Sequence, residues 1–203
     1  MGMLEGKVAL ITGGSRGQGR AHAVTCAREG ADVIIIDTLD QIESVVYPMA
    51  QQADIDETVR QVEALDRRIV AVTGDVRKQA DLDRAVSDGI AALGKIDILI
   101  ANAGIFSLAP AHELTDEAWD DMIAVNLTGV WKSAKAVLPH MMEQGGGSIV
   151  MTSSINGLEP GANYVHYCAA KFGVVGVMKT LALEYASHGI RVNSVHPGAI
   201  LTP

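Results

Sequence analysis

Three polar residues near the end of the chain have types and spacing that suit proton transfer. Tyr167 and Lys171 stand four residues apart, and on a helix such a pair shares one face, with Cβ atoms roughly 5–6 Å apart. A free phenol has a pKa of ~10, but a nearby ammonium group favours the phenolate. Ser154 lies thirteen residues upstream of Tyr167 and could hold a substrate oxygen against it. Together the three side chains predict general acid–base chemistry on an alcohol oxygen.

A glycine-rich loop, TGGSRGQG, occupies residues 12–19 directly after an apolar run. Its glycines let the backbone turn tightly and approach a ligand closely. The helix expected after it points free N–H groups and the positive end of its dipole at the same place, which favours a pyrophosphate. A similar loop also binds flavins and methyl donors in other proteins.

The Tyr, Lys and Ser residues also have simpler interpretations when each is taken alone. A Tyr–Lys pair is typical of an exposed helix face, and a serine after a strand is typical of a cap. The hypothesis of acid–base chemistry therefore rests on the occurrence of all three downstream of the glycine loop.

An acidic residue, Asp37, closes the second apolar run, 18 residues after Gly19. A carboxylate there can accept hydrogen bonds from an adenosine ribose and repels a 2′-phosphate, so it favours NAD over NADP. Arg16 weakens this inference, because its guanidinium could reach such a phosphate. The alternative is that Asp37 is a plain carboxylate at the end of a strand.

The elements that must position these residues alternate along the chain. The apolar runs are nearly continuous, which is typical of strands buried on both faces. The expected strands are 8–12, 33–37, 69–73, 96–101, 148–152 and 191–196, and the expected helices are 17–30, 54–66, 78–93, 116–143 and 165–188. This alternation predicts an α/β fold, a doubly wound parallel sheet with helices on both faces. At 203 residues we expect one dinucleotide-binding domain over 1–203.

The composition argues against several other classes of protein. The net charge of −8, with no basic stripe, disfavours binding to nucleic acid. No apolar run approaches the ~18 residues of a membrane helix, and the first residues do not have the layout of a signal peptide. Cys26 and Cys168 fit neither a disulfide framework nor a metal site, and the histidines show no ligand spacing. We therefore expect a cytoplasmic protein without a metal that acts on small molecules.

The connection over residues 38–52 is long for a link between a strand and a helix, which usually takes ~2–6 residues. One interpretation is a surface insertion with no further role. The other is a flap over whatever binds at the ends of the strands.

The whole set of motifs resembles the short-chain dehydrogenase/reductase family and covers the chain in that family's order. The residues that carry the resemblance are TGGSRGQG (Gly13, Ser15, Arg16, Gly17, Gln18 and Gly19), Asp75, Val76, Asn102, Ala103, Gly104, Asn126, Ser154, YCAAK (Tyr167 and Lys171), Pro197, Gly198 and Thr202. The resemblance implies a Rossmann fold that binds a nicotinamide cofactor. It also implies an oxidoreductase that interconverts a secondary alcohol and a ketone by hydride transfer.

The same resemblance implies a role for each site residue. Tyr167 would donate and accept the proton, Lys171 would lower the pKa of Tyr167 and bind the nicotinamide ribose, and Ser154 would orient the substrate. Asn126 would keep a water in a proton relay to Lys171. The expected cofactor contacts are Asp75 and Val76 beside the adenine, Asn102, Ala103 and Gly104 along the cleft, and Thr202 at the carboxamide, with Pro197 and Gly198 alongside.

A narrower similarity is to the carveol-dehydrogenase-like, mycofactocin-associated members of the family. In them the extra segment is thought to cover the NAD, and here that segment would be residues 42–49. Members usually run to about 250 residues or more, so this chain is C-terminally short of the family's usual length. The missing part would hold the substrate lid and the last strand. The alternative function is therefore a truncated or non-catalytic NAD-binding module.

Two helices are apolar around more of their circumference than one sheet can bury. They cover residues 116–143 and 165–188, and in the family they build the dimer interface, which implies a homodimer or homotetramer. His166 adjoins Tyr167, but adjacent residues on a helix point about 100° apart. We therefore expect His166 beside the pocket or on the surface, without a part in catalysis.

Overall fold

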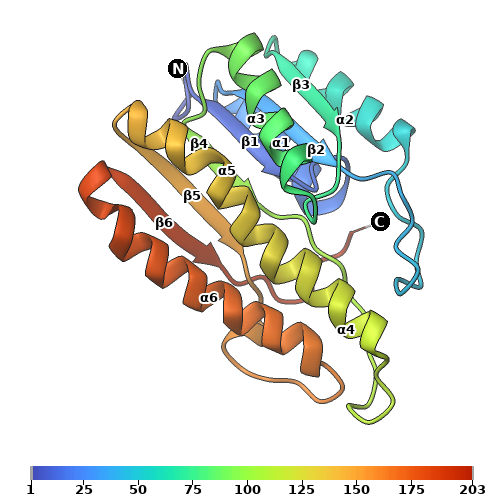
Figure 1. Ribbon diagram of the computed structural model, residues 1–203. Helices are drawn as coiled ribbons and strands as arrows, with labels where there is room; N and C mark the ends of the chain where they lie inside the picture. Colours follow the sequence, from blue (N-terminus) through green and yellow to red (C-terminus); the bar gives the residue numbers. More distant parts are fainter. Residues whose placement is uncertain (1, 203) are drawn as a thin grey trace.

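Six strands form one parallel sheet, in a computed structural model that describes residues 2–202 (Figure 1). The strands are β1 (Val8–Thr12), β2 (Asp32–Asp37), β3 (Ile69–Thr73), β4 (Ile98–Ala101), β5 (Gly147–Thr152) and β6 (Ile190–Val195). Their order across the sheet is β3-β2-β1-β4-β5-β6, so the winding reverses at β1. This topology confirms the predicted doubly wound parallel sheet. Residues 1 and 203, the ends of the predicted domain, lie outside the described part.

The connections between the strands are mostly helical (Figure 1). The helices are α1 (Gly17–Arg28), α2 (Gln52–Glu63), α3 (Gln79–Leu93), α4 (Asp116–Ile123), α5 (Val130–Glu143) and α6 (Val165–Tyr185). Helices α3, α5 and α6 pack on one face of the sheet, and α1 and α2 pack on the other. The central strand β1 shows how both faces are filled. Val8 and Leu10 belong to the apolar cluster that α3, α5 and α6 cover, whereas Ala9 and Ile11 pack beneath α1, and all four side chains are buried.

The long helix predicted for residues 116–143 is interrupted in its middle. A π-helical turn, Ala124–Gly129, separates α4 from α5. Such a turn inserts one residue into the helical repeat and turns side chains onto a different face, frequently at functional sites. Asn126 lies in this turn and is fully buried. The helical segment was therefore predicted correctly over its whole length, and the sequence did not signal the π-helical turn inside it.

The start of β4 also differs from the prediction. The strand begins at Ile98, two residues later than expected. The N–H of Ile96 donates to Nε2 of His140 (3.3 Å), and its carbonyl accepts from the side chain of Gln144 (2.8 Å). Side chains near the end of α5 therefore take the backbone groups that a strand would have used.

Residues 38–51 connect β2 to α2 as a compact loop, which we call the insertion. Gln41 organises it from inside, since its side-chain amide donates to the carbonyls of Ile42, Val45 and Tyr47 at 3.0–3.2 Å. Ile42 and Val45 are buried against the ends of β2 and β3. In Figure 1 the insertion projects from the edge of the sheet where the strands end, on the side to which the C-terminal segment also runs.

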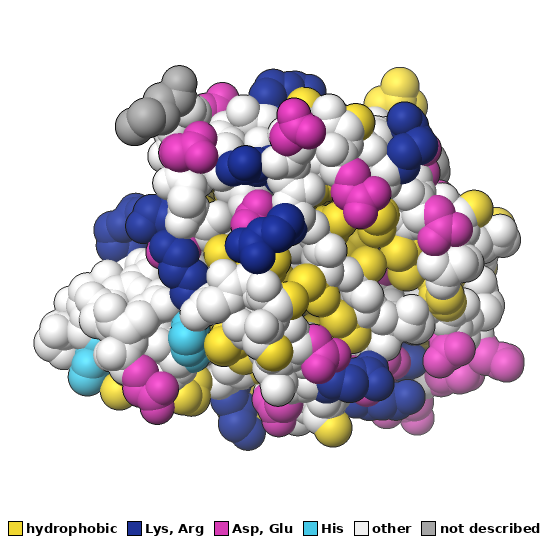
Figure 2. All heavy atoms as spheres, turned by 90° about the horizontal axis from the view of Figure 1, so that it is seen from above, with side chains coloured by type: hydrophobic (Ala, Val, Ile, Leu, Met, Phe, Trp, Pro, Cys, Tyr) yellow, Lys and Arg dark blue, Asp and Glu magenta, His cyan; other side chains and the backbone are white. Residues whose placement is uncertain are grey.

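The surface carries both signs of charge. On the face drawn in Figure 2, dark blue basic and magenta acidic side chains are interspersed around a central group of hydrophobic ones. Strand β6 is at one edge of the sheet, and β3 is at the other. Within residues 2–202, no helix combines the length and the apolar character that crossing a bilayer demands.

Candidate active site

The segment that runs from the end of β1 through the first turn of α1 can be built only with glycine at positions 13 and 19. A Cβ on Gly19 would lie 1.8 Å from the carbonyl oxygen of Gly13, and one on Gly13 would lie 2.8 Å from Cα of Ala103. Gly13 also has φ +67°, in the left-handed region. Among the described residues, no side chain caps the first turn of α1. Its N–H groups therefore remain available to a ligand that carries negative charge.

Asp37 ends β2 and lies against this loop. Its carboxylate accepts from the backbone N–H of Ser15 and of Thr38, both at 3.0 Å, and from the Ser15 hydroxyl. Burial raises the pKa of Asp37 above its ordinary value, and the hydrogen bonds and the Arg16 guanidinium oppose that rise. Asp37 thus both fixes the glycine loop and lines the cleft beside it.

Ser15 and Arg16, both predicted to bind a cofactor, lie differently with respect to the cleft. Ser15 was predicted to bind a cofactor, but its side chain is fully buried against Asp37 and does not line the cleft. Arg16 lines the cleft, yet its guanidinium donates to the carbonyl of Pro48 at 2.7 Å. The group that could have received a 2′-phosphate is thus engaged with the insertion.

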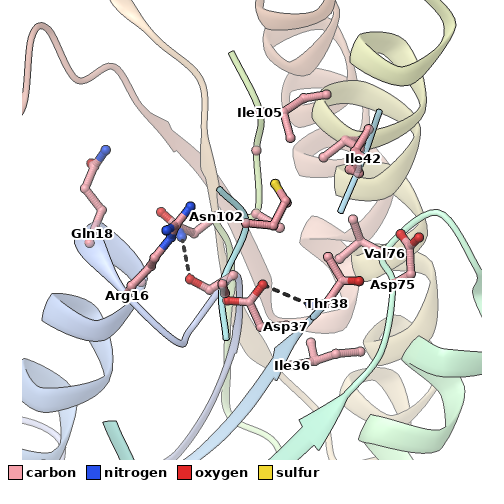
Figure 3. Close-up of a pocket in the computed structure, with 18 of the residues that line it drawn as sticks. Arg16, Gln18, Ile36, Asp37, Thr38, Ile42, Asp75, Val76, Asn102 and Ile105 are labelled. Atoms are coloured by element: carbon pink, nitrogen blue, oxygen red, sulfur yellow. Dashed lines mark hydrogen bonds between the residues drawn. The ribbon is translucent and has the colours of Figure 1, made fainter. Parts of the chain in front are cut away.

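A cavity of about 380 Å³ opens beside the glycine loop, within the range of ligand sites. Most of the predicted cofactor residues line it: Gly13, Arg16, Gly17, Gln18, Gly19, Asp37, Asp75, Val76, Asn102, Ala103, Gly104 and Thr202. Figure 3 shows Arg16 and Gln18 on one side of it and Ile42, Asp75 and Val76 on the other. The ends of β1, β2, β3 and β4 therefore meet around one hollow.

Sequence reasoning missed several residues that line this cavity. They are Ile36, Thr38, Gly74, Ile105, Phe106 and Val125. All except Phe106 directly follow or precede a predicted motif residue, and that adjacency was the available signal. Of the predicted C-terminal residues, Thr202 lies against Gly17, whereas Pro197 and Gly198 are not among the residues that line the cavity.

The insertion closes one side of the cavity with Ile42, Tyr47, Met49 and Ala50. Three contacts hold it there in addition to its own apolar core. One is the bond from Arg16 to Pro48 already described, and a second is the bond from the N–H of Phe106 to the Tyr47 hydroxyl at 3.0 Å. The third joins the insertion to α4, where the hydroxyl of Ser44 donates to Asp121 at 2.7 Å.

Lys171 is a buried cation beside a phenol. Its side chain is 3% exposed, its Nζ donates to the carbonyl of Thr152 at 2.8 Å, and it lies 5.6 Å from the centre of the Tyr167 ring. Burial lowers the pKa of Lys171 to about 8. The end of β5 thus supplies a polar partner for an ammonium group that the rest of the core would exclude.

Burial and hydrogen bonding both act on the pKa of Tyr167. Burial raises it above its ordinary value, and the nearby Ser154 hydroxyl only partly opposes that rise. The Lys171 ammonium is directed at Thr152 and is itself partly neutralised by burial. Desolvation of the phenolate is thus the largest influence on this group, and the lowering of its pKa by Lys171 that the resemblance implies stays a prediction.

Ser154 and Asn126 hold their neighbours in place. Ser154 follows β5, is buried, and its hydroxyl accepts from the N–H of Asn156 at 3.1 Å. The side chain of Asn126 accepts from the N–H of Ile105 and donates to the carbonyl of the same residue, both at 2.8 Å. Its other amide hydrogen faces the sulfur of Met122. The amide hydrogens of Asn126 are thus used within the protein, and its side chain fixes the segment after β4.

His166 lies neither at the surface nor in the cavity. It is fully buried in α6, and its Nε2 is 2.8 Å from the hydroxyl of Ser107. The sequence offered no signal for this contact, because the two residues are 59 positions apart and belong to different elements.

Comparison with known proteins places this geometry in context. Residues 7–203 match the family model described as short chain dehydrogenase. A curated relative, (-)-trans-carveol dehydrogenase of Rhodococcus erythropolis, is 47% identical across 100% of this chain and 74% of its own length.

Two solved structures are similar over almost the whole chain. A carveol dehydrogenase from Mycobacterium avium in complex with NAD is 49% identical with a TM-score of 0.95, over 97% of this chain and 72% of that one. A short chain dehydrogenase from Mycobacterium paratuberculosis bound to NAD is 46% identical with a TM-score of 0.97, over 100% of this chain and 75% of that one. With the family model matching nearly every residue, the resemblance inferred from the motifs is confirmed: this oxidoreductase belongs to the short-chain dehydrogenase family.

Proposed function

We propose that the protein interconverts a secondary alcohol and a ketone, with NAD as the hydride carrier. One observation carries the proposal: Ser154, Tyr167 and Lys171 come together where the strands end, on the same edge of the sheet as the glycine-built cavity. Two similar structures hold NAD, and two similar proteins are named as carveol dehydrogenases. NAD, when bound, accepts the hydride during alcohol oxidation and supplies it during ketone reduction.

Each polar residue of the site has one task in this proposal. In the oxidative direction the Ser154 hydroxyl holds the substrate oxygen, and the Tyr167 phenolate takes the hydroxyl proton as the C–H bond gives up its hydride. In the reductive direction the Tyr167 phenol returns that proton to the forming alkoxide. Lys171 places a positive charge near the phenolate and so opposes the cost of burying it. Asn126 fixes the segment after β4 that borders the site.

The cofactor residues divide by the part of NAD that they suit. The glycine loop and the first turn of α1 suit the pyrophosphate. Asp37 suits the hydroxyls of the adenosine ribose, and Asp75 and Val76 suit the adenine. We assign Asn102, Ala103 and Gly104 to the wall of the cleft, Lys171 to the nicotinamide ribose, and Thr202, with Pro197 and Gly198, to the nicotinamide end.

The insertion is proposed to cover the adenosine half of the cofactor. Its apolar side chains Ile42, Tyr47 and Met49 face the cavity, and the bonds from Arg16 and Phe106 join it to the opposite walls. The alternative function, an NAD-binding module without catalysis, uses the same cavity. It would bind NAD and turn over no secondary alcohol or ketone.

Mutation of Tyr167 tests the proposed chemistry. Tyr167→Phe keeps the ring and removes the hydroxyl, so we expect kcat for carveol oxidation to fall by about 10²–10⁴-fold while the Kd for NAD stays within about twofold. Steady-state absorbance of NADH and a fluorescence titration measure the two quantities. Tyr185→Phe, at the other end of α6, is the matched control. Full activity of Tyr167→Phe would remove Tyr167 from the mechanism, and NAD binding without turnover by the unaltered protein would favour the non-catalytic module.

Cofactor choice should depend on the charge of Asp37. Asp37→Asn keeps hydrogen-bond acceptors for Ser15 and removes the charge that repels a 2′-phosphate. We expect the ratio of the Kd for NADP to the Kd for NAD to fall by about tenfold or more. Asp40→Asn, on the exposed start of the insertion, should leave that ratio unchanged. An unaltered ratio in Asp37→Asn would show that another group selects the cofactor.

The burial of Lys171 predicts a pH dependence of stability. Its pKa is about 8 in the folded protein, below the ~10.4 of an unfolded chain, so the unfolded state binds more protons between these values. The folded state therefore gains stability from this group as pH rises from about 8 to about 10. Urea unfolding gives the free energy of unfolding of the unaltered protein and of Lys171→Met. Between pH 8 and pH 10 this free energy should rise by roughly 2–3 kcal/mol more in the unaltered protein than in the variant. Exposed Lys179→Met should show no such shift, and parallel pH curves for Lys171→Met would contradict the assignment.

We also propose that the chain forms a homodimer or homotetramer through α5 and α6. These two helices keep large apolar side chains exposed, including Trp131, Phe172 and Leu183. Native mass spectrometry should give at least twice the chain mass, and Phe172→Glu should shift the population toward the monomer because it buries a charge at the interface. Val46→Glu, on the exposed insertion, is the control. A monomeric unaltered protein would contradict this assembly.

A further inference from the structure

Two adjacent residues of α6 contact two adjacent residues of the loop after β4. His166 meets Ser107, as described above, and Tyr167 meets Phe106. The Phe106 ring stands edge-on to the Tyr167 ring, with centroids 5.1 Å apart and planes at 86°, a favourable arrangement for two aromatic side chains. The loop and the helix are therefore paired residue by residue beside the proposed acid–base group.

The loop is fixed on either side of this pairing. Ile105 is held by both ends of the Asn126 amide, and the N–H of Ala109 donates to the carbonyl of Asn163 at 3.2 Å. Between Ile105 and Ala109, the direction of the Phe106 side chain depends on two contacts. One is the bond from the Phe106 N–H to the Tyr47 hydroxyl, and the other is the contact between Ser107 and His166. Ser107 is the only one of these positions where a loop side chain bonds a side chain of α6 within the described residues.

The His166 ring has few ways to satisfy its polar atoms. It is fully buried, and within residues 2–202 its Nδ1 has no hydrogen-bond partner. Burial lowers the pKa of His166, so the ring is neutral at pH 7 and has one donor and one acceptor nitrogen. A buried polar group without a partner is costly, which makes the bond to Ser107 a strong restraint on where the loop can lie.

The Phe106 ring lies between the cavity and the Tyr167 phenol. It is 38% exposed, it lines the cavity, and it contacts Tyr164 as well as Tyr167, with a centroid distance of 5.6 Å to Tyr164. It thus forms an apolar wall that begins at the phenol and faces outward. A wall of this kind suits the hydrocarbon part of an alcohol and keeps water from one side of the phenol.

We propose that His166 is a positioning residue for the substrate: its bond to Ser107 fixes the loop so that Phe106 packs edge-on against Tyr167 and forms the wall for the apolar part of the alcohol. The inference rests on the proposed function of Tyr167. It assigns His166 no proton transfer, because the polar contact of its ring is with Ser107.

Kinetics test the bond through both of its partners. With carveol as substrate, His166→Leu and Ser107→Ala should each lower kcat/KM by about tenfold, mainly through KM, and the double variant should lose no more than either single one. His166→Gln and Ser107→Thr keep a hydrogen-bonding group at each end and should stay within about threefold of the unaltered protein. His140→Leu is the control, since His140 also bonds through Nε2 but at the opposite end of the sheet.

A measurement without turnover makes the inference independent of activity. The chain contains only two phenylalanines, Phe106 and Phe172, so labelling with 4-fluorophenylalanine gives two fluorine NMR signals. In His166→Leu and Ser107→Ala the Phe106 signal should shift or broaden, and the Phe172 signal should stay and report that the protein is folded.

The outcomes separate the two proposals. An unmoved Phe106 signal, unchanged kcat/KM in both single variants, or losses that add fully in the double variant would each overturn the role of His166. Full activity in Tyr167→Phe would overturn the proposed function instead, and the fluorine signals would still report whether His166 holds Phe106.

Discussion

All six strands run in the same direction, and every part of the proposed site depends on this constraint. In a parallel sheet the carboxyl ends of the strands lie along one edge, and the reversal of winding at β1 leaves a crevice there. The glycine loop, Asp37, Asp75, Asn102 and Ser154 all follow the ends of strands. Side chains separated by more than a hundred positions in sequence therefore lie at the same edge of the sheet, because the direction of the strands alone brings them there.

Burial of the polar groups of the site lowers the stability of the folded protein, because these groups lose their contact with water. Lys171 is buried with a single carbonyl as its partner, and Tyr167 is harder to ionise than a free phenol. Neither residue would be chosen for stability, since a well-packed apolar side chain avoids the desolvation of a charge. In the proposed mechanism this arrangement is useful, because a phenol and a cation that are already fixed need no reorganisation when charge develops on a substrate oxygen.

The sequence predicted what local chemistry determines. Buried strands, the glycine loop and the Tyr167–Lys171 pair each have a signature within a few residues, and the strand ranges differ from the structure by two residues at most. The π-helical turn at Asn126, the bond from Arg16 to Pro48 and the pairing of Ser107 with His166 have none, because each depends on two segments that meet only in the fold. The effect of burial on the Tyr167 pKa has no local signature for a similar reason, since burial of a side chain is a property of the whole molecule.

The central place of β1 has a consequence for how the chain is made. One neighbour of β1 is β2, in which Asp32 pairs with Val8, and it is synthesised soon after β1. The other neighbour is β4, in which Leu99 pairs with Leu10, and it is synthesised much later. Closing so long a loop is slow and must precede the contacts that reward it. A nascent chain therefore carries β1 with the backbone N–H and C=O groups of one edge unpaired until β4 leaves the ribosome, and during that interval this edge is open to unwanted pairing with other chains.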